Sequence, residues 1–428
     1  MLKNSKKTVI RIFISINAIY FFSYFQRVAV PGTIFNELQI SFLTSASAVA
    51  ALGTIFYFIY GGMQFFVGIT ADRIGANRIL LAGGAVLTIG SIFFSLSRSL
   101  PVLYINRGLV GLGSSLIYVS IVKKLDGLFD NHNFPLFLGL STALGYSGGL
   151  FGTLPFERTV RLFGWRTPMM VLSILCLLPL MHAFFLLKKS ERVFQQKKNG
   201  FSLRYIRNII RNKNTVPLIF CHSTNFSAYF LFQAVFGKKF LQDFYQLTSG
   251  TAAAFTFTMM SITIFSLLSS GFLSRVIGRR KPILIFASGL TFFTLVLFTI
   301  ALACRFSSAW FLFGYTLLAV STGSSPVSIT LMKELNPVEA AATAVGFLNG
   351  IAYLSVAMVT SLAGAGLDFF RSAAIKTGES VIYPSQAYLS VFIGCLALTA
   401  ISFYASFFIS ESCGKSAAAG NKTDFCPR

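Results

Sequence analysis

Arg27 places a guanidinium inside a long apolar stretch of this 428-residue chain. Its segment reads N-A-I-Y-F-F-S-Y-F-Q-R-V-A-V-P-G-T, and Arg27 lies well inside the apolar run that contains it. Tyr20, Tyr24 and Arg27 follow at i, i+4 and i+7, so a helix presents all three on one face. An Arg fork binds a carboxylate or a phosphate through two parallel hydrogen bonds. The segment therefore predicts an anion-binding face; snorkelling to the outer interface, or a structural pairing, is the alternative.

Other polar side chains within apolar runs are further candidates for substrate binding. Asn225, Tyr229 and Gln233 recur every four residues, which makes a polar stripe on an apolar helix. This stripe lines a cavity or forms interhelical hydrogen bonds. Arg107 contacts substrate or has a structural or coupling role, and Asn349, within G-F-L-N-G, contacts substrate or another helix. The predicted substrate-binding residues are Arg27, Tyr20, Tyr24, Arg107, Tyr146, Asn225, Tyr229, Gln233 and Asn349.

The positions of the acidic residues indicate whether a carboxylate could relay protons across the membrane. The chain has 13 Asp and Glu residues, and none lies in the middle of a predicted span. A buried carboxylate is the usual proton relay of symporters. Two intramembrane arginines without an intramembrane acid favour an anionic substrate, moved by exchange or facilitated transport rather than by carboxylate-based proton symport. Glu157, at the end of a predicted span, is the best exception.

The elements that must position these residues are membrane-spanning helices. Hydrophobic residues make up 54% of the chain and charged residues only 11%, against about 25% charged in a soluble domain. A helix needs about 20 residues to cross the hydrocarbon core. The apolar runs predict twelve spans, at 9–35, 43–71, 78–97, 100–122, 134–156, 166–187, 215–236, 249–274, 282–304, 308–332, 340–366 and 386–410.

The Lys and Arg residues predict the orientation and the domain boundaries. With the N-terminus inside, the inside segments carry 25 Lys and Arg and the outside loops 9, so both termini should be cytoplasmic. A basic linker, 188–214, separates two six-helix bundles, 1–187 and 215–410, and a cytoplasmic tail follows at 411–428. The part of the linker at 201–210 is predicted to form an amphipathic surface helix.

The most specific motif is the loop between the second and third spans. It reads G-I-T-A-D-R-I-G-A-N-R, from Gly68 to Arg78. Gly75 permits a tight turn, Asp72 caps a helix or pairs with a nearby base, and Arg73 stays at the cytoplasmic surface. The loop resembles the signature loop of the major facilitator superfamily, matching at Gly68, Asp72, Arg73, Gly75 and Arg78. That resemblance implies that the loop latches the two halves in one state of the transport cycle.

Other segments extend the resemblance over the whole chain. G-F-L-S-R-V-I-G-R-R-K, from Gly271 to Lys281, is a degenerate copy of the loop in which Arg275 replaces the Asp, and it indicates an internal repeat. R-G-L-V-G-L-G, which begins at Arg107, resembles the arginine motif of the family's fourth helix. G-L-S-T-A-L-G-Y-S-G-G provides a small-residue face for tight helix packing. Tyr146 stands there where drug antiporters have Pro, which argues against drug efflux.

The segment Y-F-Q-R resembles the first helix of the organophosphate:phosphate antiporter branch and of related bacterial organic-anion transporters. In those proteins an Arg of this helix is associated with the anionic group of the substrate, and the resemblance extends that role to Arg27. The seventh predicted span has no mid-span Arg of its own. A phosphate-ester substrate is therefore not favoured over another organic anion.

The resemblance implies an all-α integral membrane protein of twelve transmembrane helices in two pseudo-symmetric six-helix bundles. The expected function is secondary active or facilitative transport of a small organic anion by alternating access, with Arg27 as the anchor. Two alternatives stay open: a transporter-like membrane sensor that binds ligand without flux, and an exporter or importer of a siderophore, an amino acid or a drug.

Several classes are disfavoured. No nucleophile–base pair, H-E-x-x-H motif or phosphate-cradling loop indicates an enzyme, and no Cys pair has metal-ligand spacing, so neither a metal nor a cofactor is expected. The net charge of +23 lies in short loops, where it reports orientation rather than a nucleic-acid partner. A small-molecule substrate and membrane lipid are the expected partners. A monomer in a bacterial inner membrane is the expected form.

Overall fold

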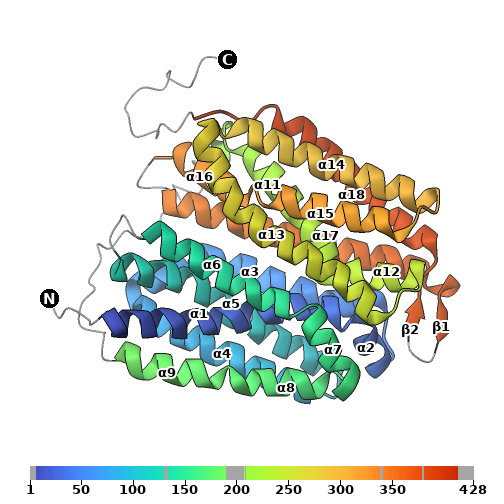
Figure 1. Ribbon diagram of the computed structural model, residues 1–428, viewed down its shortest axis with the longest axis horizontal. Coiled ribbons are helices and arrows are strands. Elements are labelled where there is room, and N and C mark those ends of the chain that lie inside the picture. The colour runs from blue at the N-terminus through green and yellow to red at the C-terminus, as the bar shows by residue number, and fades with distance from the viewer. Residues whose placement is uncertain are drawn as a thin grey trace. The chain divides into compact units, whose positions relative to one another are not determined.

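The computed structural model describes residues 6–129, 134–188, 207, 209–337, 341–377 and 380–412. The chain forms two compact units. The N-terminal unit contains Met1–Ile34 and Ile55–Gly200, and the C-terminal unit contains Phe35–Thr54 and Phe201–Arg428. Both units consist of helices coloured in chain order in Figure 1, and one small hairpin belongs to the C-terminal unit.

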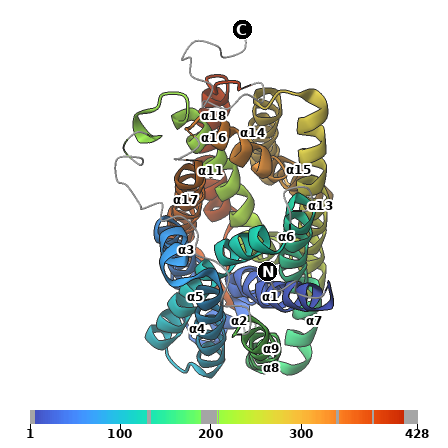
Figure 2. The ribbon, with the colours of Figure 1, turned by 90° about the vertical axis from the view of Figure 1, so that its left-hand side faces the viewer.

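The N-terminal unit is built from long helices that pack through small residues. α1 lies beside α6, and α4 beside α5 (Figures 1 and 2). A Cβ on Gly148 of α6 would lie 2.0 Å from the Phe21 carbonyl oxygen of α1, and one on Gly113 of α5 would lie 2.3 Å from the Leu87 nitrogen of α4. Only glycine permits these approaches, so the small-residue face predicted for the fifth span is confirmed. The helices of this unit are α1 (Lys6–Val28), η1 (Ala29–Thr33), α3 (Ala46–Ile74, which begins in the C-terminal unit), α4 (Ala76–Leu96), α5 (Leu100–Leu128), α6 (Phe134–Phe151), α7 (Leu154–Phe163), α8 (Arg166–Leu175) and α9 (Leu177–Lys188).

The C-terminal unit repeats this plan and adds a hairpin. Strands β1 (Ile375–Thr377) and β2 (Ser380–Ile382) pair antiparallel with Ile375 opposite Ile382. The hairpin joins two long helices, α17 and α18. The helices of this unit are α2 (Phe35–Ser41), α11 (Val216–Leu231), η2 (Phe232–Phe236), α12 (Gly237–Tyr245), α13 (Ser249–Ile277), α14 (Lys281–Ala303), α15 (Ser308–Thr322), α16 (Ser325–Glu334), α17 (Ala341–Phe369), η4 (Arg371–Ala373) and α18 (Ser385–Ser406).

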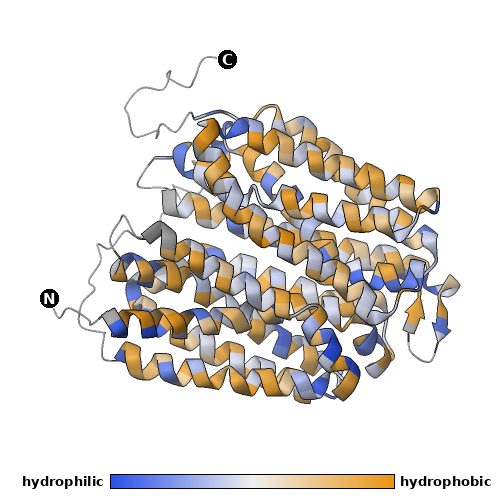
Figure 3. Ribbon diagram, in the orientation of Figure 1, coloured by the Kyte–Doolittle hydropathy of each residue, from blue (hydrophilic) through white to orange (hydrophobic). Residues whose placement is uncertain are grey.

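Nine segments of the described ranges are long and apolar enough to cross a bilayer. The other three predicted spans correspond to the 18-residue helix α6, to α11 with η2 and α12, and to α15 with α16. Hydrophobic colour dominates the helices and hydrophilic colour gathers at their ends (Figure 3). Large apolar side chains are also exposed on many helices, as expected where lipid is the solvent. The prediction of an all-α membrane protein with twelve spans is confirmed.

Corresponding elements of the two units support the internal repeat. Regular α-helix is interrupted near the end of both first spans, by a kink at Val30 within η1 and by the π-helical segment η2, which begins at Phe232. α3 and α13 each have 29 residues. Each of these two helices ends before a glycine with positive φ, Gly75 at 100° and Gly278 at 68°. These are the glycines of the two signature-loop copies, and glycine adopts this conformation without the strain that a Cβ would cause.

The fifth predicted span is interrupted in the structure, and two other predicted segments lie largely outside the described residues. The predicted span 134–156 ends at Phe151, and a separate helix, α7, begins at Leu154. The reason is Pro155, which has no N–H for a helix interior but fits the first turn of α7. The predicted amphipathic helix 201–210 falls mostly outside the described residues, as does the tail beyond Ser412.

Candidate functional site

Arg27 lies in the interior of the N-terminal unit with a side chain that is only 1% exposed. Its guanidinium carbon is 4.5 Å from the ring centroid of Tyr24, 4.5 Å from that of Tyr60 and 5.8 Å from that of Phe56. These contacts are cation–π interactions, which are strongest where water is excluded. Tyr24 comes from α1 and the other two rings from α3. The predicted common face of Tyr24 and Arg27 is therefore confirmed.

A cluster of tyrosines surrounds this arginine. Tyr24 packs against Tyr146 of α6 with ring centroids 4.3 Å apart and the rings tilted by 34°, and the Tyr20 ring centroid lies 5.9 Å from that of Tyr24 and 5.4 Å from that of Tyr118 of α5. Gly145 makes this arrangement possible, because a Cβ there would lie 2.1 Å from the Tyr20 ring. The glycine face of α6 thus brings Tyr146 against α1. The predicted residues Tyr20, Tyr24, Arg27 and Tyr146 lie together.

Arg107 reaches the same region from α5 and is fully buried. Its Nη1 donates to the Gln26 carbonyl oxygen at 3.0 Å and its Nη2 to the Val30 carbonyl oxygen. Val30 has non-helical dihedral angles (φ −121°, ψ 125°), which frees carbonyls that lipid cannot solvate. The guanidinium carbon also lies 4.4 Å from the Phe56 ring centroid. Arg107 therefore fixes the backbone before and after Arg27 through hydrogen bonds to two carbonyl oxygens.

Glu157 is the buried carboxylate of this unit, at 1% exposure. It lies in the first turn of α7, where the helix dipole favours a negative charge. Neither carboxylate oxygen has a hydrogen-bond partner among the described residues. The buried charged side chains described in this unit are thus Arg27, Arg107 and Glu157, two positive and one negative.

The predicted polar stripe of α11 and η2 divides into two parts. The Asn225 side-chain amide donates to the Ser288 hydroxyl at 3.1 Å, and the Tyr229 hydroxyl accepts from that of Thr263 at 2.9 Å. Gln233 is 2% exposed, and its amide atoms have no hydrogen-bond partner among the described residues. The half-buried Asn349 lies on α17. Asn225 and Tyr229 therefore form interhelical hydrogen bonds, whereas the Gln233 amide forms none with the described residues.

A charged network in the C-terminal unit did not follow from the sequence. Lys239 is fully buried, and its Nζ bonds Asp243 at 3.1 Å, the Asn36 side-chain oxygen at 2.9 Å and the Val381 carbonyl at 2.8 Å. Tyr388 also donates to Asp243 at 2.7 Å. Asp243 follows Lys239 by four residues, a spacing that signals such a pair. The partners from α2, β2 and α18 could not be read from local sequence.

A second carboxylate of the C-terminal unit fastens the start of α3. Asp368 accepts hydrogen bonds from the Ala46 nitrogen at 3.0 Å, the Ser47 nitrogen at 3.1 Å and the Tyr383 hydroxyl at 3.0 Å. Burial raises the pKa of Tyr383 to about 12, because the phenolate would lose solvation. The phenol therefore stays a donor at physiological pH. The network satisfies the first N–H groups of α3.

The two signature-loop copies differ in how they are held. In the first copy Gly75 precedes α4, and Arg73 and Arg78 are exposed, while the side chain of Asp72 lies outside the described part. In the second copy Arg280 pairs with Glu334 at 3.3 Å. The Glu411 carboxylate accepts from the Arg280 and Lys281 nitrogens at 3.0 and 2.8 Å and thus caps α14.

Comparison with known proteins identifies relatives of one kind. The model of the Major Facilitator Superfamily matches residues 12–361. The multidrug resistance protein MdtL of Shigella flexneri is 23% identical over 68% of this chain and 72% of its own length. The methyl viologen resistance protein SmvA of Salmonella typhimurium is 24% identical over 34% of this chain, and the human monocarboxylate transporter 7 is 23% identical over the same share. The chain spans only 30% of the length of SmvA and 28% of that of the human transporter.

Solved structures share the fold. A bacterial homologue of the human lysosomal transporter Spinster, inward-facing and unoccupied, superimposes with a TM-score of 0.73 over 95% of this chain and 98% of its own, at 15% identity. A peptide transporter in complex with sulfate gives a TM-score of 0.74 over 96% of each chain, at 13% identity. At such identities the likeness concerns the fold alone.

Proposed function

Since this chain belongs to the Major Facilitator Superfamily, it is a multi-pass membrane protein of a transporter family rather than an enzyme, and we propose that its cargo is a small organic anion. Transport is secondary active or facilitative and proceeds by alternating access. Arg27 anchors the anionic group of the substrate.

The environment of Arg27 is the observation that carries this proposal. Tyr24 and Tyr60 contact the guanidinium at 4.5 Å each, and the side chain is 1% exposed. A guanidinium binds anions through N–H groups that lie in its plane. That in-plane edge matches the two oxygens of a carboxylate or phosphate. A buried, ring-held arginine is thus prepared for an anion without a large loss of side-chain entropy.

The balance of buried charges in the N-terminal unit also supports a negatively charged substrate. Arg27 and Arg107 are buried against a single buried carboxylate, Glu157, among the described side chains of the N-terminal unit. A charge inside a membrane protein is costly unless it is compensated. An anion that binds beside the two arginines balances the excess of positive charge. A cation would add to the imbalance.

The remaining predicted residues take supporting roles in the proposal. Tyr20, Tyr24 and Tyr146 form the aromatic wall beside the anion, and Arg107 positions Arg27 through the backbone of the first span. In the C-terminal unit, the unused amide of Gln233 offers a donor and an acceptor to polar parts of the substrate. Asn225, Tyr229 and Asn349 complete the proposed substrate-binding set.

The proposal also covers orientation, assembly and the cytoplasmic loop. Both termini face the cytoplasm of a bacterial inner membrane, and the protein acts as a monomer. The signature loop latches the two halves in one state of the cycle through Gly68, Asp72, Arg73, Gly75 and Arg78.

Export of a drug is the second candidate function. The observation in its favour is the similarity to MdtL, a multidrug resistance protein, over 68% of the chain. Aromatic clusters such as that around Tyr24 also suit flat lipophilic cations. Arg27 opposes this candidate, because a buried positive charge repels a cationic drug.

Ligand-induced thermal stabilisation of the purified protein tests the proposal. Organic acids, sugar phosphates, amino acids, citrate-type siderophores and lipophilic cations are screened in detergent. A ligand at 100 times its dissociation constant stabilises the folded state by about 2.7 kcal/mol. Each hit is repeated on Arg27→Gln and on Arg98→Gln, a matched variant of an exposed arginine in the same unit.

An anion that stabilises the wild type and Arg98→Gln but not Arg27→Gln supports the anchor. Stabilisation of all three proteins by cations or neutral lipophiles alone rejects it and favours drug export. Flux of the stabilising anion into liposomes then distinguishes a carrier from a sensor that binds without transport.

A further inference from the structure

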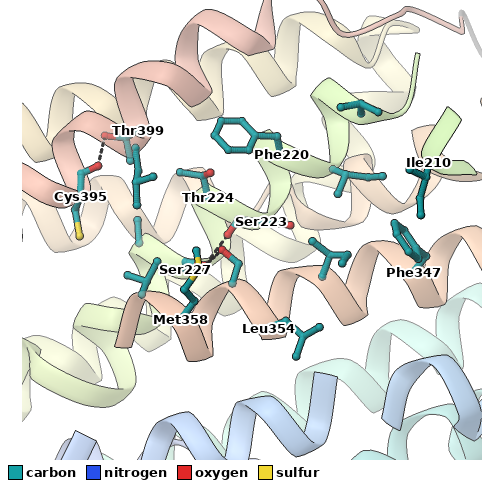
Figure 4. A pocket seen from close by; sticks show the side chains of 17 residues that line it. Ile210, Phe220, Ser223, Thr224, Ser227, Phe347, Leu354, Met358, Cys395 and Thr399 are labelled. Atoms are coloured by element: carbon teal, nitrogen blue, oxygen red, sulfur yellow. Dashed lines mark hydrogen bonds between the residues drawn. The ribbon is translucent and has the colours of Figure 1, made fainter. Parts of the chain in front are cut away.

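The C-terminal unit contains an elongated cavity whose lining includes none of the proposed substrate-binding residues. Its volume is about 580 Å³, and helices α11, α17 and α18 supply nearly all of its lining. Figure 4 shows Ile210 and Phe347 at one end and Cys395 with Thr399 at the other. Several lining side chains are exposed at its rim, including Ile210 at 54%, Val216 at 48% and Met358 at 55%. The cavity is therefore a groove that opens on the surface of its own unit.

The groove offers an apolar wall to a ligand. Most of its lining is aliphatic or aromatic, and the hydroxyls of Ser227 and Thr399 are bonded within the protein. Ser227 donates to the Ser223 carbonyl oxygen at 2.7 Å and lies 2.8 Å from the Ser355 hydroxyl oxygen, and Thr399 donates to the Cys395 carbonyl oxygen at 2.9 Å. Hydroxyls that are satisfied locally add little polarity to a surface.

The length of the groove fits a single acyl chain. Its α11 lining runs from Val216 to Ala228, which at the helical rise of 1.5 Å per residue is about 18 Å. Half of a hydrocarbon core of about 30 Å is about 15 Å. The groove thus extends over about the depth of one leaflet.

Three cations lie next to the end of the groove formed by Ile210 and Val216. Arg207, Arg211 and Lys213 are all exposed and are within three residues of these two lining residues. The nearby segment is fastened to the unit, because the Asn212 side chain donates to the Leu335 carbonyl oxygen at 3.3 Å.

The acidic side chains described near this end of the C-terminal unit are engaged elsewhere. Glu334 pairs with Arg280 at 3.3 Å, and Glu411 accepts the backbone N–H groups at the start of α14. The described side chains near this end of the groove therefore carry an excess of positive charge.

We propose that this groove is a binding site for an anionic phospholipid. One acyl chain occupies the groove along α11, and the phosphate-bearing head group contacts Arg207, Arg211 and Lys213. The charge complementarity selects an anionic lipid over a zwitterionic one. Because the predicted orientation places this segment on the cytoplasmic side, the lipid belongs to the inner leaflet. The site does not depend on Arg27 or on the identity of the transported substrate.

Native mass spectrometry of the full-length protein tests this site. The protein is released from detergent micelles that contain equal amounts of dioleoyl phosphatidylglycerol and dioleoyl phosphatidylcholine, and bound lipids are counted. Each cation near an anionic surface adds about fivefold in affinity, so the wild type should retain phosphatidylglycerol at least about tenfold over phosphatidylcholine. A triple variant, Arg207→Gln/Arg211→Gln/Lys213→Gln, should lose this preference.

Matched variants separate the groove from general lipid adhesion. Leu354→Trp fills the groove and should abolish the retained lipid, whereas Leu362→Trp adds the same indole to a 62% exposed position of the same helix and should not. Arg158→Gln/Arg161→Gln removes two exposed charges from the N-terminal unit and should keep the preference. If Leu354→Trp is not monodisperse, Met358→Trp at the exposed rim provides the same test.

Two results would overturn the proposal. Equal retention of both lipids by the wild type would show that the three cations do not bind an anionic head group. Unchanged retention of phosphatidylglycerol by a folded groove-filling variant shows that the lipid binds elsewhere.

Discussion

Replacement of Arg27 by Lys keeps the positive charge and removes the fork, so it isolates the geometry that the proposal requires. The guanidinium is positioned by ring contacts at 4.5 Å on Tyr24 and Tyr60. An ammonium has no planar edge and meets a carboxylate as a point charge. The substitution therefore converts a bidentate contact into a single hydrogen bond while the attraction between unlike charges remains.

The loss can be worked out from that one contact. A hydrogen bond to a charged group contributes about 1.5–3 kcal/mol, and each 1.4 kcal/mol is about tenfold in affinity. Arg27→Lys should therefore raise the dissociation constant of the anion about 10- to 150-fold. Arg27→Gln, which also removes the charge, should weaken binding further.

Isothermal titration calorimetry of the stabilising anion measures this change. Arg98→Lys is the matched control, because Arg98 is exposed in the same unit. It should bind like the wild type. A dissociation constant for Arg27→Lys within about threefold of the wild-type value, less than one lost hydrogen bond, would refute the bidentate anchor, even if binding depended on charge.

Three further changes test the packing, the capping and the coupling. Gly148→Ala places a Cβ 2.0 Å from the Phe21 carbonyl oxygen, so it should destabilise the protein by about 1–3 kcal/mol through overpacking, seen as a lower thermal unfolding midpoint in detergent. Asp368→Asn removes the charge of the carboxylate that accepts from the first N–H groups of α3 and should cost about 1–2 kcal/mol by the same measurement, since a charged acceptor contributes more than a neutral one. Glu157→Gln should leave exchange of the anion across proteoliposomes intact, because the account assigns no proton transfer to this buried carboxylate.

A specific result would contradict each of these three predictions. Gly139 lies on the same helix as Gly148 and has open space at its Cβ position, so Gly139→Ala should be tolerated; equal effects of the two changes would remove the close-approach argument. An unchanged midpoint for Asp368→Asn would show that its contacts to α3 contribute no net stability. Loss of gradient-driven accumulation in Glu157→Gln, with exchange retained, would assign proton coupling to Glu157.

The architecture follows from the sequence wherever the determinant is local. Apolar run length predicted the spans, and Gly75 in the signature loop predicted the tight turn before α4. The interruption at Val30 had a local signal in Pro31, because a proline disfavours the helical conformation of the residue before it. Its hydrogen-bond partner had none, because the donor to the freed Val30 carbonyl oxygen is Arg107, which comes 77 residues later. The break before α7 had a local signal in Pro155, which the hydropathy of the run obscured.

The candidate site was predictable only along its own helix. The i, i+4 and i+7 spacing placed Tyr24 beside Arg27, and the structure confirms that contact. Tyr60 and Phe56 come from α3, and no periodicity relates two helices whose packing is unknown. Lys239 lies just beyond the seventh predicted span and is buried, because Asp243 and groups from α2 and β2 compensate its charge. Such compensation depends on long-range contacts.

Counterflow of the stabilising anion into proteoliposomes shows whether transport depends on Arg27. Vesicles preloaded with unlabelled anion receive trace labelled anion outside, and counterflow is followed for the wild type, Arg27→Gln and Arg98→Gln. The account predicts accumulation by the wild type and the Arg98 variant and none by the Arg27 variant. Counterflow by Arg27→Gln at the wild-type rate would contradict the account, because the anion would then cross without the arginine that is proposed to hold it.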